Sequence, residues 1–260
     1  MTWIGRVLRL AAANGVPGGG LLVGWSPATA LTLYWVDNLV GSFAMGVRIA
    51  LHRRLTGASG HDRGQLGATS RTGSSAARPF RSFLAEFLVT SVAFTLVQGV
   101  FLAVLLGGVM DARPEGESLR QGALGIAGCH LLALASDAVT LRTWPFARVK
   151  EQATYAMGRV VVVHLVIIGG MAWLAASGSS TGVFAIFIVL KLLVDLGSML
   201  PQIEPGGAPP RWLAALMKRV PTKTGETFEE YWRRTHAEEL AQAARDELPV
   251  ARGSERPRHR

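Results

Sequence analysis

The chain has 260 residues, of which 49% are hydrophobic and 17% are charged, whereas a typical soluble domain has about 25% charged residues. Lys and Arg number 27 against 18 Asp and Glu, so the formal net charge is +9. The apolar content excludes disorder over most of the chain, and the single cysteine, Cys129, excludes a disulfide scaffold. This composition predicts an all-α, polytopic membrane protein with basic polar segments.

Six apolar stretches predict about six transmembrane helices, because a membrane-spanning helix needs about 20 mostly apolar residues. The predicted spans are residues 7–24, 28–51, 83–107, 121–141, 157–177 and 181–200. The first stretch has two interpretations. Arg6 and Arg9 followed by Ala28-Thr29-Ala30 resemble a cleaved signal peptide. A retained helix bent at Pro17 is the preferred interpretation, because no second start signal lies in the long apolar run that follows.

The basic residues lie on one side of the predicted membrane. With the N-terminus inside, the inner segments hold 23 of the 27 Lys and Arg, and the outer segments hold only Arg113 and Arg120. Cytoplasmic loops of membrane proteins carry an excess of Lys and Arg. The pattern therefore predicts a bacterial inner (plasma) membrane protein with both termini in the cytoplasm.

The polar segments divide the chain into a bundle, residues 1–200, and a cytoplasmic tail, residues 201–260. Residues 56–79 are rich in Gly, Ser, Thr and Arg, which predicts a flexible cytoplasmic loop. In the tail, residues 211–220 (RWLAALMKRV) predict an interfacial helix. A second helix is expected over 224–248, opened by Thr224, and a disordered basic end follows.

Ionisable and amide side chains inside the spans predict an intramembrane polar cluster. A charged group there costs about 2.5–3.5 kcal/mol on insertion scales, so it usually faces the bundle interior. The predicted members are Asp37, Asn38, His130, Asp137, Arg159, His164, Lys191 and Asp195. The span directions let these groups share one layer in the inner half of the membrane. Arg48 and Glu86 are expected close enough to the inner ends for their charges to reach the interface.

Each of these residues has a structural and a functional interpretation. Lys191 and Asp195, four residues apart, neutralise each other on one helix face, and the short link between the last two spans brings them towards Arg159 and His164. For His130 and the Asp37-Asn38 pair, hydrogen-bonded helix packing is the preferred interpretation. Small residues at four-residue spacing, such as Ser42 and Gly46, allow close helix approach.

The sequence lacks the common catalytic and cofactor-binding motifs. The chain has no G-x-S-x-G, H-E-x-x-H or Walker A sequence, and Gly18-Gly19-Gly20 lacks the following Lys of a phosphate loop. One cysteine cannot form a C-x-x-C pair. No cofactor, metal or catalytic residue is therefore predicted, and membrane topology accounts for the basic tail without nucleic acid.

Motifs around the polar positions resemble a prokaryotic family of multi-pass membrane proteins, the domain of unknown function 6498 family. Trp25-Ser26-Pro27 followed by residues 33–38 (LYWVDN) is similar to its first signature, which usually reads Tyr-Trp-x-Glu-Asn. Residues 158–164 (GRVVVVH) with Gly169-Gly170 and residues 191–195 (KLLVD) resemble its second.

The resemblance covers about residues 7–200, including a third-span pattern at 94–101 (FTLVQGVF). The chain departs from the family pattern at residues 136–138 (SDA), where Ser-His-Gly is usual, and at 155–159 (YAMGR), where Pro-Tyr-Gly-Arg is usual. The resemblance implies a membrane fold and no established activity.

Three classes of function remain open after these observations. The preferred one is a non-enzymatic membrane scaffold or assembly partner, whose partners are the lipid bilayer, anionic lipid head groups at the basic inner segments, and a second copy or another membrane protein. The second is a small proton-coupled carrier that uses Asp37, Asp137, His164 and Asp195. The third is an intramembrane enzyme in which His164 and a neighbouring carboxylate act as acid and base.

Overall fold

The structure is a computed structural model, and it describes residues 7–8, 15–16, 19–20, 23–62, 82–109, 111–158, 160, 209, 214, 217 and 227–249. Within these residues the chain is helical, and its only extended pairing is an isolated bridge between Ala58 and Pro249. The described part is thus all-α, as predicted. Several predicted segments lie wholly or mostly outside the described residues: spans 7–24, 157–177 and 181–200, loop 56–79, helix 211–220 and the basic end.

Helix α3, Pro27–Thr56, is the longest described helix, with 30 residues. It begins at Ser26, whose side chain accepts a hydrogen bond from the backbone N–H of Thr29 at 3.2 Å, and Pro27 suits the first helical position. It ends at Gly57, where φ is 64° and the N–H caps the Arg53 carbonyl. At 1.5 Å per residue the helix is about 45 Å long, enough to cross a bilayer.

The other long elements follow in chain order. A 3₁₀ turn, η2, covers Ser59–Asp62. Helix α4, Phe83–Val104, continues into a π-helical turn, η4, Leu105–Val109. Helix α5, Gly116–Ala138, leads through the 3₁₀ turn η5, Leu141–Thr143, into a helix that begins at residue 146.

One helix in the described residues, Phe83–Gly108, is long and apolar enough to cross a membrane by length and composition alone. Length and composition of the described helices therefore do not establish all six predicted spans. Helices α3 and α5 have a lower mean hydropathy because they carry the charged side chains that the sequence places in their interiors.

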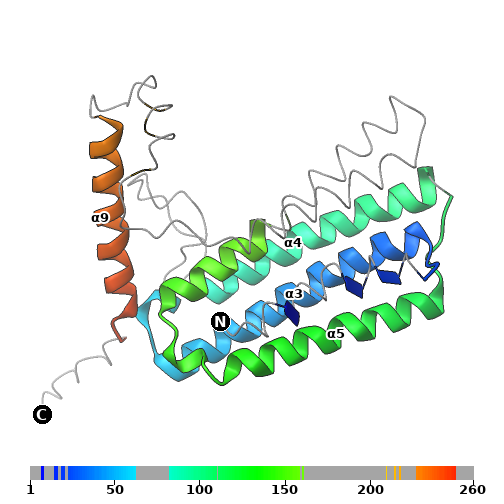
Figure 1. Cartoon of the computed structure of the whole chain (residues 1–260), viewed down its shortest axis with the longest axis horizontal. Helices are drawn as coiled ribbons and strands as arrows, with labels where there is room; N and C mark the ends of the chain where they lie inside the picture. Colours follow the sequence, from blue (N-terminus) through cyan, green and yellow to red (C-terminus); the bar gives the residue numbers. More distant parts are fainter. Residues whose placement is uncertain are drawn as a thin grey trace, which may run out of the picture.

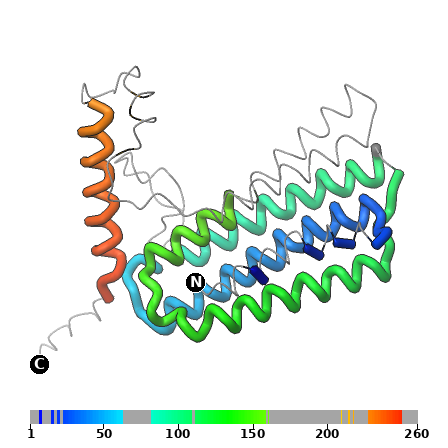
Figure 2. The backbone as a smooth tube through the Cα atoms, in the orientation of Figure 1, coloured from blue at the N-terminus to red at the C-terminus, as the bar shows by residue number. Residues whose placement is uncertain are grey.

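The three long helices lie side by side, with α3 between α4 and α5 (Figure 1). The N–H of Glu115 donates to Thr29 at one end of α3, and Arg48 meets Asp137 towards the other, so α3 and α5 run parallel. Helix α4 runs antiparallel to both, as the tube in Figure 2 shows. Successive helices therefore run in opposite directions along the bundle, which places residues 52–62 and 137–150 at the same end.

An apolar cluster fills that end, which we call the inner end. Its buried members come from α3, the link between α3 and η2, the start of α4 and residues 141–153: Met45, Ile49, Ala58, Phe83, Phe87, Leu141, Trp144, Phe146, Val149 and Ala153. Phe146 contacts Phe83 edge to face, with the ring centroids 5.3 Å apart. This cluster fixes how the chain turns from α5 into the next helix.

Helix α9, Phe228–Glu247, lies at the inner end and runs in a different direction from the helices of the bundle (Figure 1). It begins with a capping box in which Thr227 and Glu230 bond each other's backbone N–H groups, so Thr227 rather than the predicted Thr224 caps it. Its last residues contact η2: the N–H of Ser59 donates to Leu248 O at 2.8 Å, and the Ser59 hydroxyl donates to Arg245 O at 3.0 Å.

Candidate polar site in the helix bundle

Two buried pairs of ionisable side chains join α3 to α5. His130 Nε2 lies 2.9 Å from Asp37 Oδ1, and Arg48 Nε donates to Asp137 Oδ2 at 3.0 Å. All four side chains are at most 4% exposed. Because a lone buried charge is strongly destabilising, each partner supplies the compensation that allows the other to be buried. The pairs therefore specify which faces of α3 and α5 meet.

Amide side chains join α3 to α4 in a similar way. Asn38 Nδ2 donates to Gln98 Oε1 at 3.4 Å, and Gln98 Nε2 donates in turn to the carbonyl of Val160 at 2.9 Å. Trp35 Nε1 donates to the carbonyl of Thr95 at 2.8 Å. Gln98 thus links Asn38 on α3 to Val160, although it lies in a stretch of α4 that is largely apolar.

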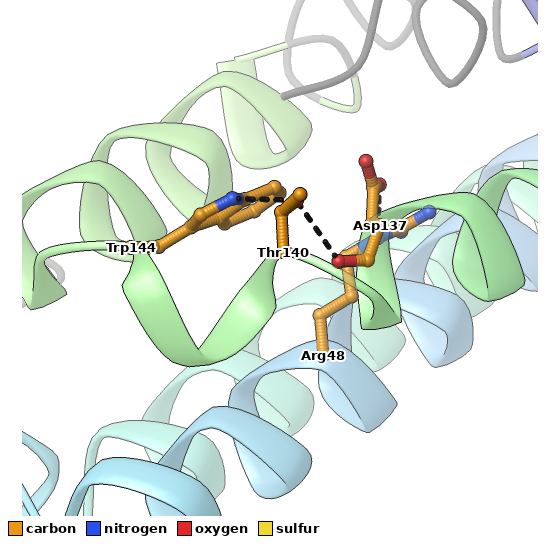
Figure 3. A network of polar contacts seen from close by, with 4 residues as sticks. All are labelled: Arg48, Asp137, Thr140 and Trp144. Atoms are coloured by element: carbon orange, nitrogen blue, oxygen red, sulfur yellow. Dashed lines mark hydrogen bonds and ion pairs between the residues drawn. The ribbon is translucent and has the colours of Figure 1, made fainter.

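The charged pairs occupy two levels of the bundle rather than the single shared layer expected from the sequence. His130 and Asp137 are seven residues apart on α5, which corresponds to about 10 Å along the axis. Arg48 also differs from the expectation that it reaches the interface. It is 2% exposed, because Asp137 on the neighbouring helix lies close enough to neutralise it (Figure 3).

Glycines at the contact faces bring the polar side chains within reach of one another. A Cβ at Gly41 would lie 3.3 Å from Cε1 of His130, and one at Gly122 would lie 2.4 Å from the Leu33 side chain. At the α3–α4 contact, Gly46 faces Leu88 and Gly99 faces Trp35. Small residues therefore set the spacing of the three helices, as is common where helices pack in membranes.

A histidine pair lies at the inner end. His52 Nε2 is 2.9 Å from the Trp144 carbonyl, so it donates and His52 Nδ1 accepts from His61 Nε2 at 2.8 Å. His61 Nδ1 then carries no proton, and it has no hydrogen-bond partner among the described residues. Burial, His52 and the Arg53 guanidinium lower the pKa of His61 from 6.5 to about 4. This arrangement keeps His61 neutral at physiological pH.

The structure accounts for four of the predicted polar residues. Asp37 and His130 contact each other, while Asn38 and Asp137 bond to Gln98 and Arg48 instead. The other four, Arg159, His164, Lys191 and Asp195, lie outside the described residues, so the predicted contact between the fifth and sixth spans does too. Within the described residues, no three His, Cys, Asp or Glu side chains gather closely enough to hold a metal ion.

Sequence reasoning missed Gln98 and the pair His52 and His61. Gln98 has no charge, so a search for ionisable residues passes over it. His61 lies in a loop, and only the fold of the chain after α3 brings it against His52. A usable signal for Gln98 was that it is the only amide in the apolar run of residues 87–107.

These contacts define an all-helical protein whose long helices are joined by buried charged and amide pairs. Over residues 5–227 the chain matches the model of a family described as "Family of unknown function (DUF6498)", and it belongs to that family. No curated protein and no solved structure shows significant similarity to the chain.

Proposed function

We propose that this chain is a multi-pass membrane protein and that its activity is structural: it serves as a scaffold or assembly partner held together by its buried polar pairs. The observation that carries the proposal is the reversed polarity of α4. Between the buried apolar residues Phe87 and Leu102, the buried side chains are Ser91, Thr95 and Gln98, whereas the exposed side chains of the helix are aliphatic or aromatic. In water the opposite arrangement is favoured, and in lipid this one is favoured.

Exposed apolar side chains cover all three long helices in the same region. They include Val89, Leu96 and Val100 on α4, which are 52%, 56% and 66% exposed, and Leu124 and Leu131 on α5, which are 63% and 65% exposed. Large exposed apolar patches are rare on soluble monomers and mark membrane or protein contacts. Contact with acyl chains removes the cost of exposing it to water.

The distribution of basic residues supports an inner-membrane orientation. Arg53, Arg54, Arg142, Arg148 and Lys150 lie at the inner end of the bundle, and Arg113 and Arg120 lie at the other end. This is the asymmetry that the positive-inside rule requires. The inner end, where helix α9 lies, is accordingly cytoplasmic in our proposal.

The pairing of the buried charges supports a scaffold over a catalyst. Asp37 and Asp137 each contact a basic side chain on the neighbouring helix. A catalytic or transport group needs access to a substrate or to water, whereas a group engaged in a helix–helix contact contributes to the specificity of packing. Helix α9 leaves Tyr231 and Leu240 exposed for contact with a partner on the cytoplasmic side.

Two measurements test the membrane proposal. Membranes that contain the expressed protein are washed with alkaline carbonate, which releases peripheral proteins and leaves embedded ones. Periplasm-active and cytoplasm-active reporters are then fused after Leu55, Arg113 and Lys150. We expect retention in the pellet, periplasmic activity only after Arg113, and cytoplasmic activity after the other two. Release by carbonate, or a periplasmic signal after Lys150, would overturn the proposed topology.

A proton-coupled carrier is the second candidate, because one buried histidine offers a proton-accepting nitrogen. His130 Nε2 bonds Asp37, while its buried Nδ1 has no hydrogen-bond partner in the described part of the chain. The discriminating experiment is reconstitution in vesicles that contain a pH-sensitive dye. Proton flux that disappears in Asp37→Asn, while the variant keeps the thermal stability of the wild type, would replace the scaffold with a carrier.

A further inference from the structure

At the inner end the chain turns from α5 into the next helix through residues 139–150, and this segment holds Arg148 in a fixed position. The Arg148 guanidinium lies over the Trp144 ring, with Cζ 4.6 Å from the centroid. Trp144 is only 4% exposed, and its Nε1 donates to the Thr140 hydroxyl at 3.1 Å. That hydroxyl donates in turn to the carbonyl of Asp137 at 3.3 Å (Figure 3). Arg148 is therefore positioned by a chain of contacts that begins at the buried Arg48–Asp137 pair.

Two further cations lie at the same end and have no ion-pair partner among the described residues. Arg142 is exposed on η5, and Arg54 is exposed in the last turn of α3, which packs against η5. Two nearby carboxylates are engaged elsewhere: Asp62 with Arg53, and Glu247 with the backbone N–H of Ala147. Arg54 and Arg142 thus add exposed positive charge to the end of the bundle that holds Arg148.

Exposed apolar side chains near the C-terminal end of α5 precede these cations in the chain. Leu131, Leu132 and Val139 are 65%, 59% and 84% exposed, and Val139 precedes Arg142 by three residues. A ligand that complements this surface has an apolar portion running along α5 and an anionic group at its end. Inorganic phosphate and soluble nucleotides lack the apolar portion, whereas an anionic phospholipid has both.

We propose that Arg142 and Arg148, together with Arg54, bind the phosphate of an anionic phospholipid whose acyl chain lies along Leu131, Leu132 and Val139. The site rests on the proposed membrane embedding and adds a specific partner to it. Arginine suits this role because its planar guanidinium binds phosphate through two hydrogen bonds and stacks on an aromatic ring. Trp144 and Thr140 act as positioning residues, since they orient Arg148 and do not face the lipid phosphate in this scheme.

The test uses the full chain purified in a neutral detergent, with phosphatidylglycerol as the probe and thermal unfolding and native mass spectrometry as readouts. We expect phosphatidylglycerol to stabilise the wild type, and phosphatidylcholine or inorganic phosphate to have little effect. In Arg142→Gln/Arg148→Gln the affinity should fall about 25-fold, since each cation beside an anionic surface contributes about a five-fold factor. The matched control is Arg113→Gln/Arg120→Gln, which removes the same charge at the opposite end and should bind like the wild type.

Three results would overturn the proposal: undiminished phosphatidylglycerol binding by Arg142→Gln/Arg148→Gln, an equal effect of phosphatidylcholine, or an equal effect of inorganic phosphate. If Arg142→Gln/Arg148→Gln does not fold, Arg142→Lys/Arg148→Lys replaces it, and this lysine variant should keep phosphatidylglycerol binding that weakens at high salt. Loss of all binding by the lysine variant would show that the arginine geometry, and not charge alone, binds the phosphate. Binding that does not depend on salt would contradict the site. Failure of membrane embedding is detected separately, because carbonate extraction reports it without any lipid titration.

Discussion

The middle of the bundle and its inner end differ in the side chains that they bury and expose. In the middle, α3, α4 and α5 bury Asp37, Gln98 and His130 and expose valine and leucine. At the inner end, phenylalanine and tryptophan are buried, and arginines are exposed. The inner end resembles the core of a soluble domain, and the middle has the arrangement that the proposed membrane embedding requires. The boundary between the two lies within a few residues of Thr140, between the Arg48–Asp137 pair and Trp144.

The largest expected effect comes from leaving one buried charge without its partner. Asp137→Leu should destabilise the protein by about 3–5 kcal/mol, because Arg48 stays buried and uncompensated. Arg48→Met/Asp137→Leu removes both charges and should recover most of that loss. Thermal unfolding in detergent measures both variants. Equal stability of the single and double variants would show that the pair contributes nothing specific.

The second-largest expected effect comes from a lysine on the exposed apolar face, which should be costly in the middle of the bundle and tolerated at its inner end. Val100→Lys puts a charge in the middle of α4 and should cost about 3 kcal/mol for membrane insertion. Leu55→Lys, at the inner end, is the control and should be nearly neutral, since Leu55 is 41% exposed beside Arg53 and Arg54. The yield of membrane-inserted protein measures the difference. Comparable yields would mean that water surrounds the middle of the bundle.

Close helix contact in the middle predicts a smaller effect. Gly122→Ala places a Cβ 2.4 Å from the Leu33 side chain and should cost about 1–3 kcal/mol through overpacking. Gly128→Ala on the same helix meets nothing within 4 Å and should be neutral or slightly stabilising. The two midpoints of thermal unfolding provide the comparison. A reversed order would contradict the α3–α5 contact.

The smallest expected effect on stability comes from His61 at the inner end, and it depends on pH. The folded pKa of His61, about 4, lies below its ordinary value of 6.5. The unfolded state therefore binds more protons between these values, so stability is complete above pH 6.5 and falls as the pH drops towards 4. We expect a loss of about 1–2 kcal/mol between pH 7 and pH 5.

His61→Gln is the variant that tests this pH effect. It should reduce the difference in thermal stability between pH 7 and pH 5, while Glu117→Gln, at an exposed outer position, should leave it unchanged. If His61→Gln and the wild type lose the same stability on acidification, another group is responsible for the dependence.

Local pattern predicted much of the fold. Apolar runs predicted helices where the structure has α3, α4 and α5. A charged segment with aromatic residues predicted a helix over 224–248, which contains α9. The ends were less exact: α3 continues to Thr56 because the first αL residue, Gly57, lies beyond the apolar run, and α5 begins at Gly116 because polar residues extend its first turn. Hydropathy marks where a helix is buried in lipid or protein, whereas capping residues mark where it ends.

Sequence also identified Asp37, Asn38, His130 and Asp137 as polar residues in apolar surroundings, and burial costs alone require such residues to face inward. The partners were decided by tertiary structure. Asp137 contacts Arg48, which is 89 residues away in the chain, and Gln98 lies between Asn38 and Val160. Helical periodicity places a side chain on a face, but the crossing of two helices at glycines such as Gly41 and Gly122 determines which faces meet. The docking of α9 on Ser59 likewise depends on where the end of α3 lies in space, and no local pattern carries that information.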